Sequence, residues 1–228
     1  MSLPSLAPSA RMGEQVVEAL QAAILSGDLP PGTRLRIRDV AEQLGTSVMP
    51  VREAMTRLEE AGLVESLPYR GAIVRAFSPD EMLDVYDVRS MLEAEAARRG
   101  GENADEALVS RMVARYARAR DAIEVGNHVA FLDRDEEFLQ ELYAAAGNLV
   151  LLETIRSLWR RSRSFKLFGV RGESAGDPST LLGYQDDLIE AVNQGDGALA
   201  ARVVTESIGR ATAAIRNGLR GTGAGTTD

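Results

Sequence analysis

The clearest recognition chemistry in this chain belongs to arginines and a serine in its first quarter. Arg34, Arg36 and Arg38 alternate along a segment that we expect to be extended, which would present their side chains on one side. Ser47 is a good N-cap for a helix that carries Arg52 near its start. Guanidinium groups make two-pronged contacts to phosphates and guanine edges, and the free N–H groups of a helix start bind phosphate. These residue types therefore favour contact with nucleic acid.

Composition excludes most catalytic and metal chemistry. The 228 residues include no cysteine and one histidine, which rules out disulfides, thiolate zinc sites, cysteine nucleophiles and multi-histidine metal sites. No histidine lies near a serine, no glycine-rich phosphate loop is found, and a lone Asp135 is not a mechanism, so we expect no enzyme. No apolar run approaches the roughly 18 residues of a membrane span, and the first residues lack the apolar core of a signal peptide. We therefore expect a cytoplasmic protein with no membrane partner.

The net charge of −8 argues against a protein that coats nucleic acid without specificity. Residues 11–77 hold 8 arginines and 9 acidic residues, whereas residues 78–228 hold 18 basic and 25 acidic residues. Lys166 is the single lysine, and we attribute the high arginine content to genome composition. A nearly neutral N-terminal part fits a dimer on a specific site better than a tight nonspecific binder, because phosphate contacts dominate nonspecific affinity.

Proline, glycine and apolar periodicity predict the elements that must position these residues. In the N-terminal part, apolar residues four apart predict a first helix, and Gly62 ends a third. The expected elements are a helix from near Met12 to Gly27, a short helix over 37–44, a helix from Ser47 to about Ala61, and strands over 63–67 and 72–77 around the turn 68–71. These elements form a helix-turn-helix followed by a wing.

From Ser78 onward the pattern is helix after helix, each opened by a capping residue and closed by glycine. The expected helices span residues 78–101, 103–126, 127–147, 148–168, 177–195 and 196–218, with a loop over 169–176. The predicted fold class is mainly α: an N-terminal winged helix-turn-helix with a small β-hairpin wing, then an antiparallel all-α bundle of about six helices. The expected domains are a winged helix-turn-helix domain over 11–77 and an all-α domain over 78–218, between disordered segments at 1–10 and 219–228.

In a winged helix-turn-helix, the start of the second helix of the motif enters the major groove and the wing reaches the backbone. Glycine at the wing tip lets the backbone approach DNA closely. The expected DNA contacts are Arg34, Arg36, Arg38, Ser47, Val48, Met49, Arg52, Thr56, Arg70 and Gly71. Arginine clusters alone are weak evidence, and the alternative is a structural domain whose arginines form a solvated face.

Three segments of the N-terminal part, PPGTRLRIRDVAEQLGTS, PVREAMTRLEEAGLV and YRGAIV, resemble the GntR family of winged-helix transcription regulators over about 60 residues in the right order. The resemblance implies that Arg38, Ser47, Arg52 and Gly71 contact DNA and that residues 48–50 vary with operator sequence. Here these three residues offer apolar contacts to thymine methyl groups and little hydrogen bonding. Arg38 and Arg52 are then the main readers of sequence.

The C-terminal part resembles the ligand-sensing domain of the FadR subgroup, called FCD, through VYDVRSMLEAEAARR, FLDRDEEFLQELYAAAGN and YQDDLIEAVNQGDGALAARVVTES. The resemblance implies a divalent-metal site made by an aspartate and three histidines. The aspartate position is Asp135, and the histidine positions are occupied by Leu139, Gln185 and Ser207. Such a set is poor for zinc or nickel, so we expect no transition-metal cofactor, while a hard ion such as magnesium at Asp135 stays open.

We expect instead a metal-free effector cavity. Arg89 lies on the inward stripe of the first bundle helix, and the resemblance implies that it faces the ligand, where it could hold a carboxylate by a two-pronged pair. The alternative for Arg89 is a buried ion pair with Glu93 or Asp135. Trp159 is expected in the core, and the basic run 160–165 is interpreted as a solvated helix face. The expected effector-binding residues are Arg89, Asp135, Leu139, Gln185 and Ser207.

The predicted function is a bacterial transcription regulator, more often a repressor in this family, that acts as a homodimer on double-stranded operator DNA. A small-molecule effector, expected to be an organic acid, would modulate operator affinity. Two alternatives remain. The bundle could be only a dimerisation scaffold, which the absent histidines favour, or the chain could be an enzyme on an all-α domain, for which no catalytic constellation is visible.

Overall fold

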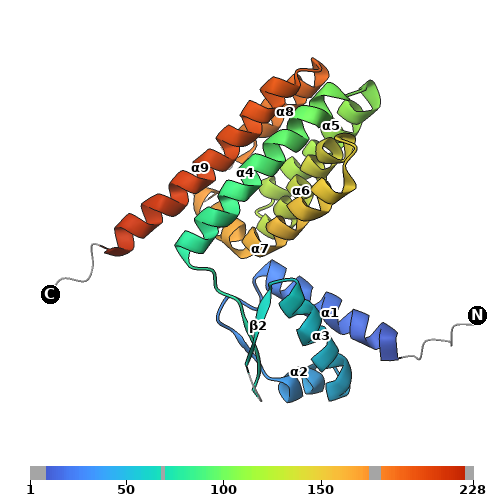
Figure 1. The fold of residues 1–228 in the computed structure, drawn as a ribbon, viewed down its shortest axis with the longest axis vertical. Helices are drawn as coiled ribbons and strands as arrows, with labels where there is room; N and C mark the ends of the chain where they lie inside the picture. The colour runs from blue at the N-terminus through green and yellow to red at the C-terminus, as the bar shows by residue number, and fades with distance from the viewer. Residues whose placement is uncertain (1–8, 68–69, 175–180, 224–228) are drawn as a thin grey trace, which may run out of the picture. The chain divides into compact units, whose positions relative to one another are not determined.

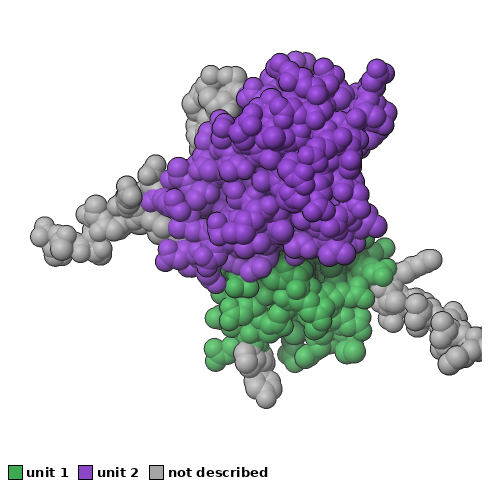
Figure 2. Space-filling view, turned by 45° about the horizontal axis from the view of Figure 1, so that its top comes forward, with its two compact units in different colours: residues 1–76 green, residues 77–228 purple. Residues whose placement is uncertain are grey.

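The computed structural model describes residues 9–67, 70–174 and 181–223 (Figure 1). The chain divides into two compact units, Met1–Ala76 and Phe77–Asp228, which are coloured separately in Figure 2. The predicted fold class is confirmed, since the fold is mainly helical with one small antiparallel sheet after a helix-turn-helix. In chain order the elements are α1 (Ser9–Ser26), β1 (Arg34–Leu35), α2 (Ile37–Gln43), α3 (Val48–Glu60), β2 (Val64–Leu67), β3 (Gly71–Val74), α4 (Pro79–Glu102), α5 (Glu106–Glu124), α6 (His128–Ala145), α7 (Leu149–Ser174), α8 (Gly183–Asn193) and α9 (Gly197–Gly223).

The first unit is built around one apolar core. The stripe on α1 that includes Val16 and Leu20 is buried together with Val51 and Leu58 of α3, as the four-residue spacing predicts. Met12 was expected on the same stripe but is 43% exposed, because it lies near the start of α1, beyond the residues that pack together. The helices α1 and α2 both pack against α3, which leaves one face of α3 open.

The wing is a three-stranded sheet rather than the expected two-stranded hairpin. The strand order is β1-β3-β2, with Leu35 of β1 paired antiparallel with Ala72 of β3. Gly71 was expected in the turn but begins β3, with a φ of 95°. A Cβ atom at Gly71 would lie 2.1 Å from the carbonyl oxygen of Leu35, so glycine is required for β1 to approach. Residues 68 and 69 of the expected turn lie outside the described residues.

The second unit is the expected bundle, in which α4 packs along α9 and also contacts α6, α7 and α8, while α5 packs on α6 (Figure 1). Its helices begin where the sequence carries capping residues. Ser78 forms a capping box with Glu81, and the side chain of Asn127 accepts a hydrogen bond from the backbone of α6. One cap differs from the prediction: Asn103 ends α4, and Asp105 caps α5 by accepting from the backbone N–H of Leu108 at 2.7 Å.

Two glycines that were expected to stop α4 instead allow close helix packing. The helix continues through Gly100 and Gly101 to Glu102. A Cβ at Gly101 would lie 2.9 Å from the Cα of Gly197 on α9, and a Cβ at Gly197 would lie 2.2 Å from the carbonyl oxygen of Arg98. The absence of side chains at these positions therefore sets the distance between α4 and α9.

Other helix ends also differ from the prediction. The loop expected over 169–176 is helical to Ser174, because burial of Leu167 and Val170 outweighs the modest helix penalty of Gly169. The expected helix start at 177–178 lies outside the described residues, and α8 begins at Gly183. At the chain ends, α1 already includes residues 9 and 10, and α9 makes residues 219–223 of the expected disordered tail helical. In the described part of the chain, no helix is long and apolar enough to cross a membrane.

The close approach of α4 and α9 predicts opposite effects of alanine at two glycines of α9. Gly197→Ala should lower the free energy of unfolding by about 1–3 kcal/mol, because the new methyl group meets backbone that cannot move cheaply. Gly209→Ala is the matched control: its Cβ meets no atom within 4 Å, so it should stabilise the helix by about 0.5–1 kcal/mol. Chemical denaturation of both variants measures the difference, and equal stabilities would contradict the packing described.

Candidate functional site

The open face of α3 carries four of the residues expected to contact DNA. Val48 and Met49 lie four and three residues before Arg52, and Thr56 lies four residues after it. All four are exposed, whereas Val51 is fully buried. Met49 is 60% exposed and Val48 beside it is 39% exposed, so the start of α3 presents two apolar side chains to solvent. Arg52 forms no ion pair with any residue that the structure describes, so its guanidinium is free for a partner.

The start of α3 is also open. Ser47 is the N-cap residue in an extended conformation, but its side chain makes no capping hydrogen bond. The hydroxyl of Ser47 and the first N–H groups of α3 thus remain available for an anion. Pro50 is buried in the first turn, where the missing N–H of proline is tolerated.

The other arginines expected to contact DNA are close to the start of α3 in the sequence, but they do not lie on one extended segment. Arg34 lies on β1 and Arg36 is the extended N-cap of α2, whereas Arg38 lies within α2, so the expected alternation ends at Arg36. All three side chains are exposed, and Arg36 has a loose ion pair of 4.0 Å with Asp39. Arg70 is exposed before β3, and the partly exposed Gly71 follows it.

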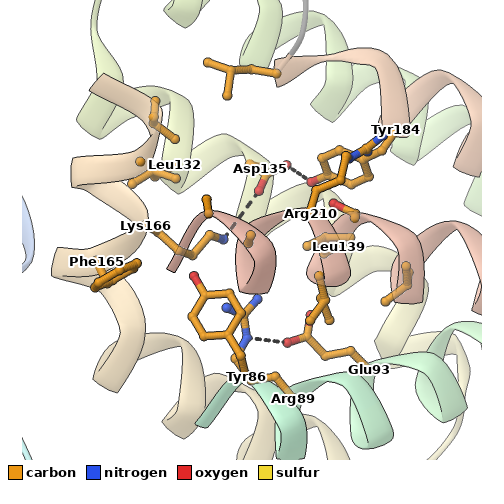
Figure 3. A pocket seen from close by; sticks show the side chains of 18 of the residues that line it. Tyr86, Arg89, Glu93, Leu132, Asp135, Leu139, Phe165, Lys166, Tyr184 and Arg210 are labelled. Carbon is orange, nitrogen blue, oxygen red and sulfur yellow. Dashed lines mark hydrogen bonds and ion pairs between the residues drawn. The ribbon is translucent and has the colours of Figure 1, made fainter. Parts of the chain in front are cut away.

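A second candidate site lies in the bundle, where a cavity of about 590 Å³, partly open to solvent, is lined mainly by α4, α6, α7 and α9 (Figure 3). Much of its wall is apolar, including Phe131, Leu132, Leu139, Phe165, Val204 and Ile208. This volume is within the range of cavities that bind small molecules. Several of the polar groups at its wall are already engaged with one another, as Arg89 is with Glu93 and Asp135 is with Lys166.

Of the five residues expected to line an effector site, Arg89, Asp135, Leu139 and Ser207 do so. Gln185 does not: it is completely buried behind Asp135, and its Nε2 donates to Asp135 Oδ1 at 2.9 Å. Gln185 therefore acts on the cavity only by fixing the carboxylate of Asp135.

Arg89 forms the buried ion pair that was the alternative interpretation of it. Its Nε lies 2.7 Å from Glu93 Oε1, and its guanidinium carbon lies 4.6 Å from the ring centre of Tyr86. Glu93 also accepts hydrogen bonds from Trp159 Nε1 at 3.0 Å and from the hydroxyl of Tyr143 at 3.2 Å. Burial raises the pKa of Tyr143, and the charge of Glu93 raises it further, so the hydroxyl remains a donor. A ligand carboxylate would have to compete with Glu93 for Arg89.

Asp135 is the second buried carboxylate, and each of its oxygens has a partner (Figure 3). Oδ1 accepts from Gln185 and from the hydroxyl of Tyr184, while Oδ2 lies 3.6 Å from Nζ of Lys166. Burial raises the pKa of Tyr184 well above its ordinary value, and the neighbouring carboxylate adds to the effect, so this hydroxyl also stays protonated. The three partners come from α7 and α8.

The four positions that the resemblance assigns to a metal do not fit one here. Leu139 has no ligand atom, and the amide nitrogen of Gln185 points to Asp135 as a donor. The ammonium of Lys166 already places a positive charge beside Asp135. Within the described residues, no group of three or more His, Cys, Asp or Glu side chains could hold a metal ion. Zinc and nickel prefer sets of imidazole or thiolate ligands, which these side chains do not supply.

Sequence reasoning missed several polar groups of the cavity, above all Lys166, Tyr184 and Arg210. Weak signals existed: Lys166 is the single lysine, and Arg210 lies one turn after Ser207 on α9. No local pattern says that Lys166 meets Asp135, because they lie on different helices.

The basic run 160–165 was interpreted as a solvated face, and this is wrong in its centre. Ser162 and Arg163 are buried. Arg163 forms ion pairs with Asp133 and, at 3.0 Å, with Glu136, both on α6. The run therefore joins α7 to α6 rather than facing solvent.

Comparison with known proteins finds relatives of both parts of the chain. Residues 12–74 match the family described as bacterial regulatory proteins, gntR family, and residues 84–210 match the FCD domain. The chain is 26% identical over 211 residues to the HTH-type transcriptional repressor RspR of Escherichia coli (strain K12), with 92% of each protein covered. It is 29% identical over 133 residues to the Nta operon transcriptional regulator of Aminobacter aminovorans, which covers 58% of this chain and 63% of that protein.

The structure of E. coli McbR/YncC superposes with a TM-score of 0.76 at 23% identity and covers 91% of this chain and 98% of the other, which shows a shared fold. The family and the relatives named above are transcriptional regulators rather than enzymes. The FCD match alone spans more than half of the chain. The chain therefore belongs to the GntR family of transcriptional regulators, with a GntR-type helix-turn-helix domain followed by an FCD domain.

Proposed function

We propose that this protein is a cytoplasmic, homodimeric repressor whose operator affinity is modulated by an organic acid bound in the bundle without a transition metal. The observation that carries the proposal is the cavity of about 590 Å³, which combines apolar walls with cationic side chains. A cavity of this kind in a DNA-binding protein supports a ligand-responsive switch.

On DNA, Arg38 and Arg52 would read base edges, since an unpaired guanidinium can donate two hydrogen bonds to guanine. Val48 and Met49 would make apolar contacts in the major groove. Ser47, Arg34, Arg36, Thr56, Arg70 and Gly71 would contact the phosphate backbone and set the register. In the homodimer, two such units would bind the half-sites of an inverted repeat.

The effector would be held in the cavity by groups around Asp135 and Ser207, with Leu139 against its apolar part and Arg89 and Gln185 shaping the polar end. Binding there changes operator affinity only if the ligand prefers one arrangement of the DNA-binding units over another. The coupling is then equal in both directions, so operator DNA would weaken effector binding by the same factor.

A second candidate function is a DNA-binding dimer whose bundle is only a scaffold. One observation favours it: Arg89 and Asp135 already have protein partners, as they would in a degenerate cavity that no longer binds a ligand. In that case no small molecule changes stability or operator affinity.

Native mass spectrometry of the purified protein, compared with its denatured mass, separates the two functions. A dimer that carries a small organic mass supports the effector-responsive regulator. A dimer without a bound small molecule favours the function in which the bundle is only a scaffold. A dimer with one metal ion per subunit contradicts the metal-free cavity.

The DNA-binding face predicts a specific loss in Arg52→Ala. This variant should weaken operator binding and relax discrimination at one base pair by about 1–3 kcal/mol, because one guanidinium contact to a base edge is lost. Arg57→Ala is the control, since Arg57 is also an exposed arginine of α3 but lies in its last turn. Binding to operator variants by fluorescence anisotropy measures both, and equal losses in the two variants would mean that charge alone matters.

The poor ligand set around Asp135 predicts no response to transition metals. Zinc or nickel at micromolar concentration should leave the melting temperature of the EDTA-treated protein unchanged, because a ligand stabilises a protein only if it binds the native state. A saturable rise of several degrees, measured by differential scanning fluorimetry, would show that oxygen ligands around Asp135 suffice.

A further inference from the structure

Lys166 is a cavity cation whose hydrogen bonds the protein leaves open. Its Nζ lies 3.6 Å from Asp135 Oδ2 and 3.9 Å from Glu136 Oε1, which is within ion-pair range but beyond hydrogen-bond distance. Its side chain is only 14% exposed. An ammonium has three donors, and donors taken out of water without acceptors cost free energy. Lys166 is therefore ready to donate to an oxygen that enters the cavity.

The charged groups that line the cavity leave an excess of one positive charge. Arg89 is balanced by Glu93, and Lys166 by Asp135. Arg210 on α9 also lines the cavity; it is exposed to solvent and has no ion pair with any residue in the described ranges. A ligand with a single negative charge would therefore neutralise the cavity, whereas a dianion would leave a charge without a partner.

The rest of the cavity wall favours a ligand whose uncharged part is apolar. Side chains such as Phe131, Leu132, Phe165 and Ile208 offer no hydrogen bonds, and their contacts with hydrocarbon would stabilise the complex in proportion to the area removed from water. Polar groups on the ligand far from its anionic end would lose water without gaining partners.

We propose that Lys166 is the fixed cation of this cavity and binds the carboxylate of a small, apolar monocarboxylate, with Arg210 as the second contact. The ammonium beside Asp135 takes the electrostatic role that a bound divalent ion would otherwise have, so binding needs no metal. The inference rests on the proposed function only in treating this ligand as the effector.

The chain contains one tryptophan, which gives a direct readout of binding. Trp159 donates to Glu93 at 3.0 Å, and its ring centre lies 6.0 Å from Nζ of Lys166. Selective excitation of this residue therefore reports on the polar side of the cavity. The probes are octanoate and benzoate, with octanamide and benzamide as neutral controls, all in the presence of EDTA.

Octanoate or benzoate should change the fluorescence of Trp159 in a saturable way, while the two amides should bind much more weakly. Lys166→Met keeps a side chain of similar length without the charge, and it should reduce the affinity for the carboxylate about 10- to 100-fold. Lys166→Arg should retain most of it. Arg202→Met removes an exposed charge of α9 outside the cavity and should change nothing.

A single variant could lose binding only because it leaves Asp135 buried without a cation. The double variant Asp135→Asn with Lys166→Met removes both charges of the pair and avoids this cost. It should bind octanoate as weakly as Lys166→Met does. Full affinity in the double variant would mean that Lys166 only balances Asp135, and this would overturn the inference.

Other results would also overturn it: unchanged affinity in Lys166→Met, binding that occurs only when EDTA is left out, or no saturable signal with either carboxylate. Operator binding with and without octanoate tests the proposed function separately. Lys166-dependent binding without any change of operator affinity leaves this inference standing and refutes the effector role. An operator response to octanoate that persists in Lys166→Met supports the effector role and refutes this inference.

Discussion

Two carboxylates buried in an apolar bundle constrain almost every polar group around the cavity. Glu93 and Asp135 are 1% and 5% exposed, and a buried charge is tolerated only when partners surround it. The partners of Glu93 come from α4, α6 and α7, and those of Asp135 come from α7 and α8. The two acids thereby tie four helices together, and loss of one cationic partner would cost about 3–5 kcal/mol.

The same constraint decides which polar atoms are left for a ligand. Arg89 is held by Glu93, and Gln185 is held behind the cavity wall by Asp135. Some groups at the wall keep hydrogen-bonding capacity, among them the ammonium of Lys166, the guanidinium of Arg210 and the hydroxyl of Ser207. Arg89 is thus a structural cation, and the cations that are available to a ligand lie on α7 and α9.

The sequence predicts what is encoded locally. The capping residues at Ser78 and Asn127 mark helix starts correctly, because a cap is satisfied by backbone within the next few residues. The two-residue strand β1 escapes prediction, because only its pairing with β3 makes it a strand. Likewise, α7 continues past Gly169 because Leu167 and Val170 are buried against other helices, which outweighs local helix preference.

The two candidate sites differ in the same way, since local spacing predicts one of them and helix packing determines the other. The exposed face of α3 follows from helical spacing alone, since Met49 and Arg52 lie about 160° and about 100° around the helix from the buried Val51. The cavity does not, because the pairing of Lys166 with Asp135 depends on how α6 and α7 are aligned. The resemblance to a known family placed Asp135 at the site but could not reveal which side chain would face it.

The helix α7 gives the cavity a physical connection to the first residue of the bundle unit. Phe165 and Lys166 line the cavity, and Arg161, about one turn earlier on the same helix, lies with its guanidinium carbon 5.6 Å from the ring centre of Phe77. Phe77 directly precedes the capping box that starts α4. A helix moves as a rigid element, so a ligand that displaces Lys166 acts on the same element that holds Phe77. In the regulator proposed above, a ligand would couple the cavity to this segment only if its affinity differed between two positions of α7.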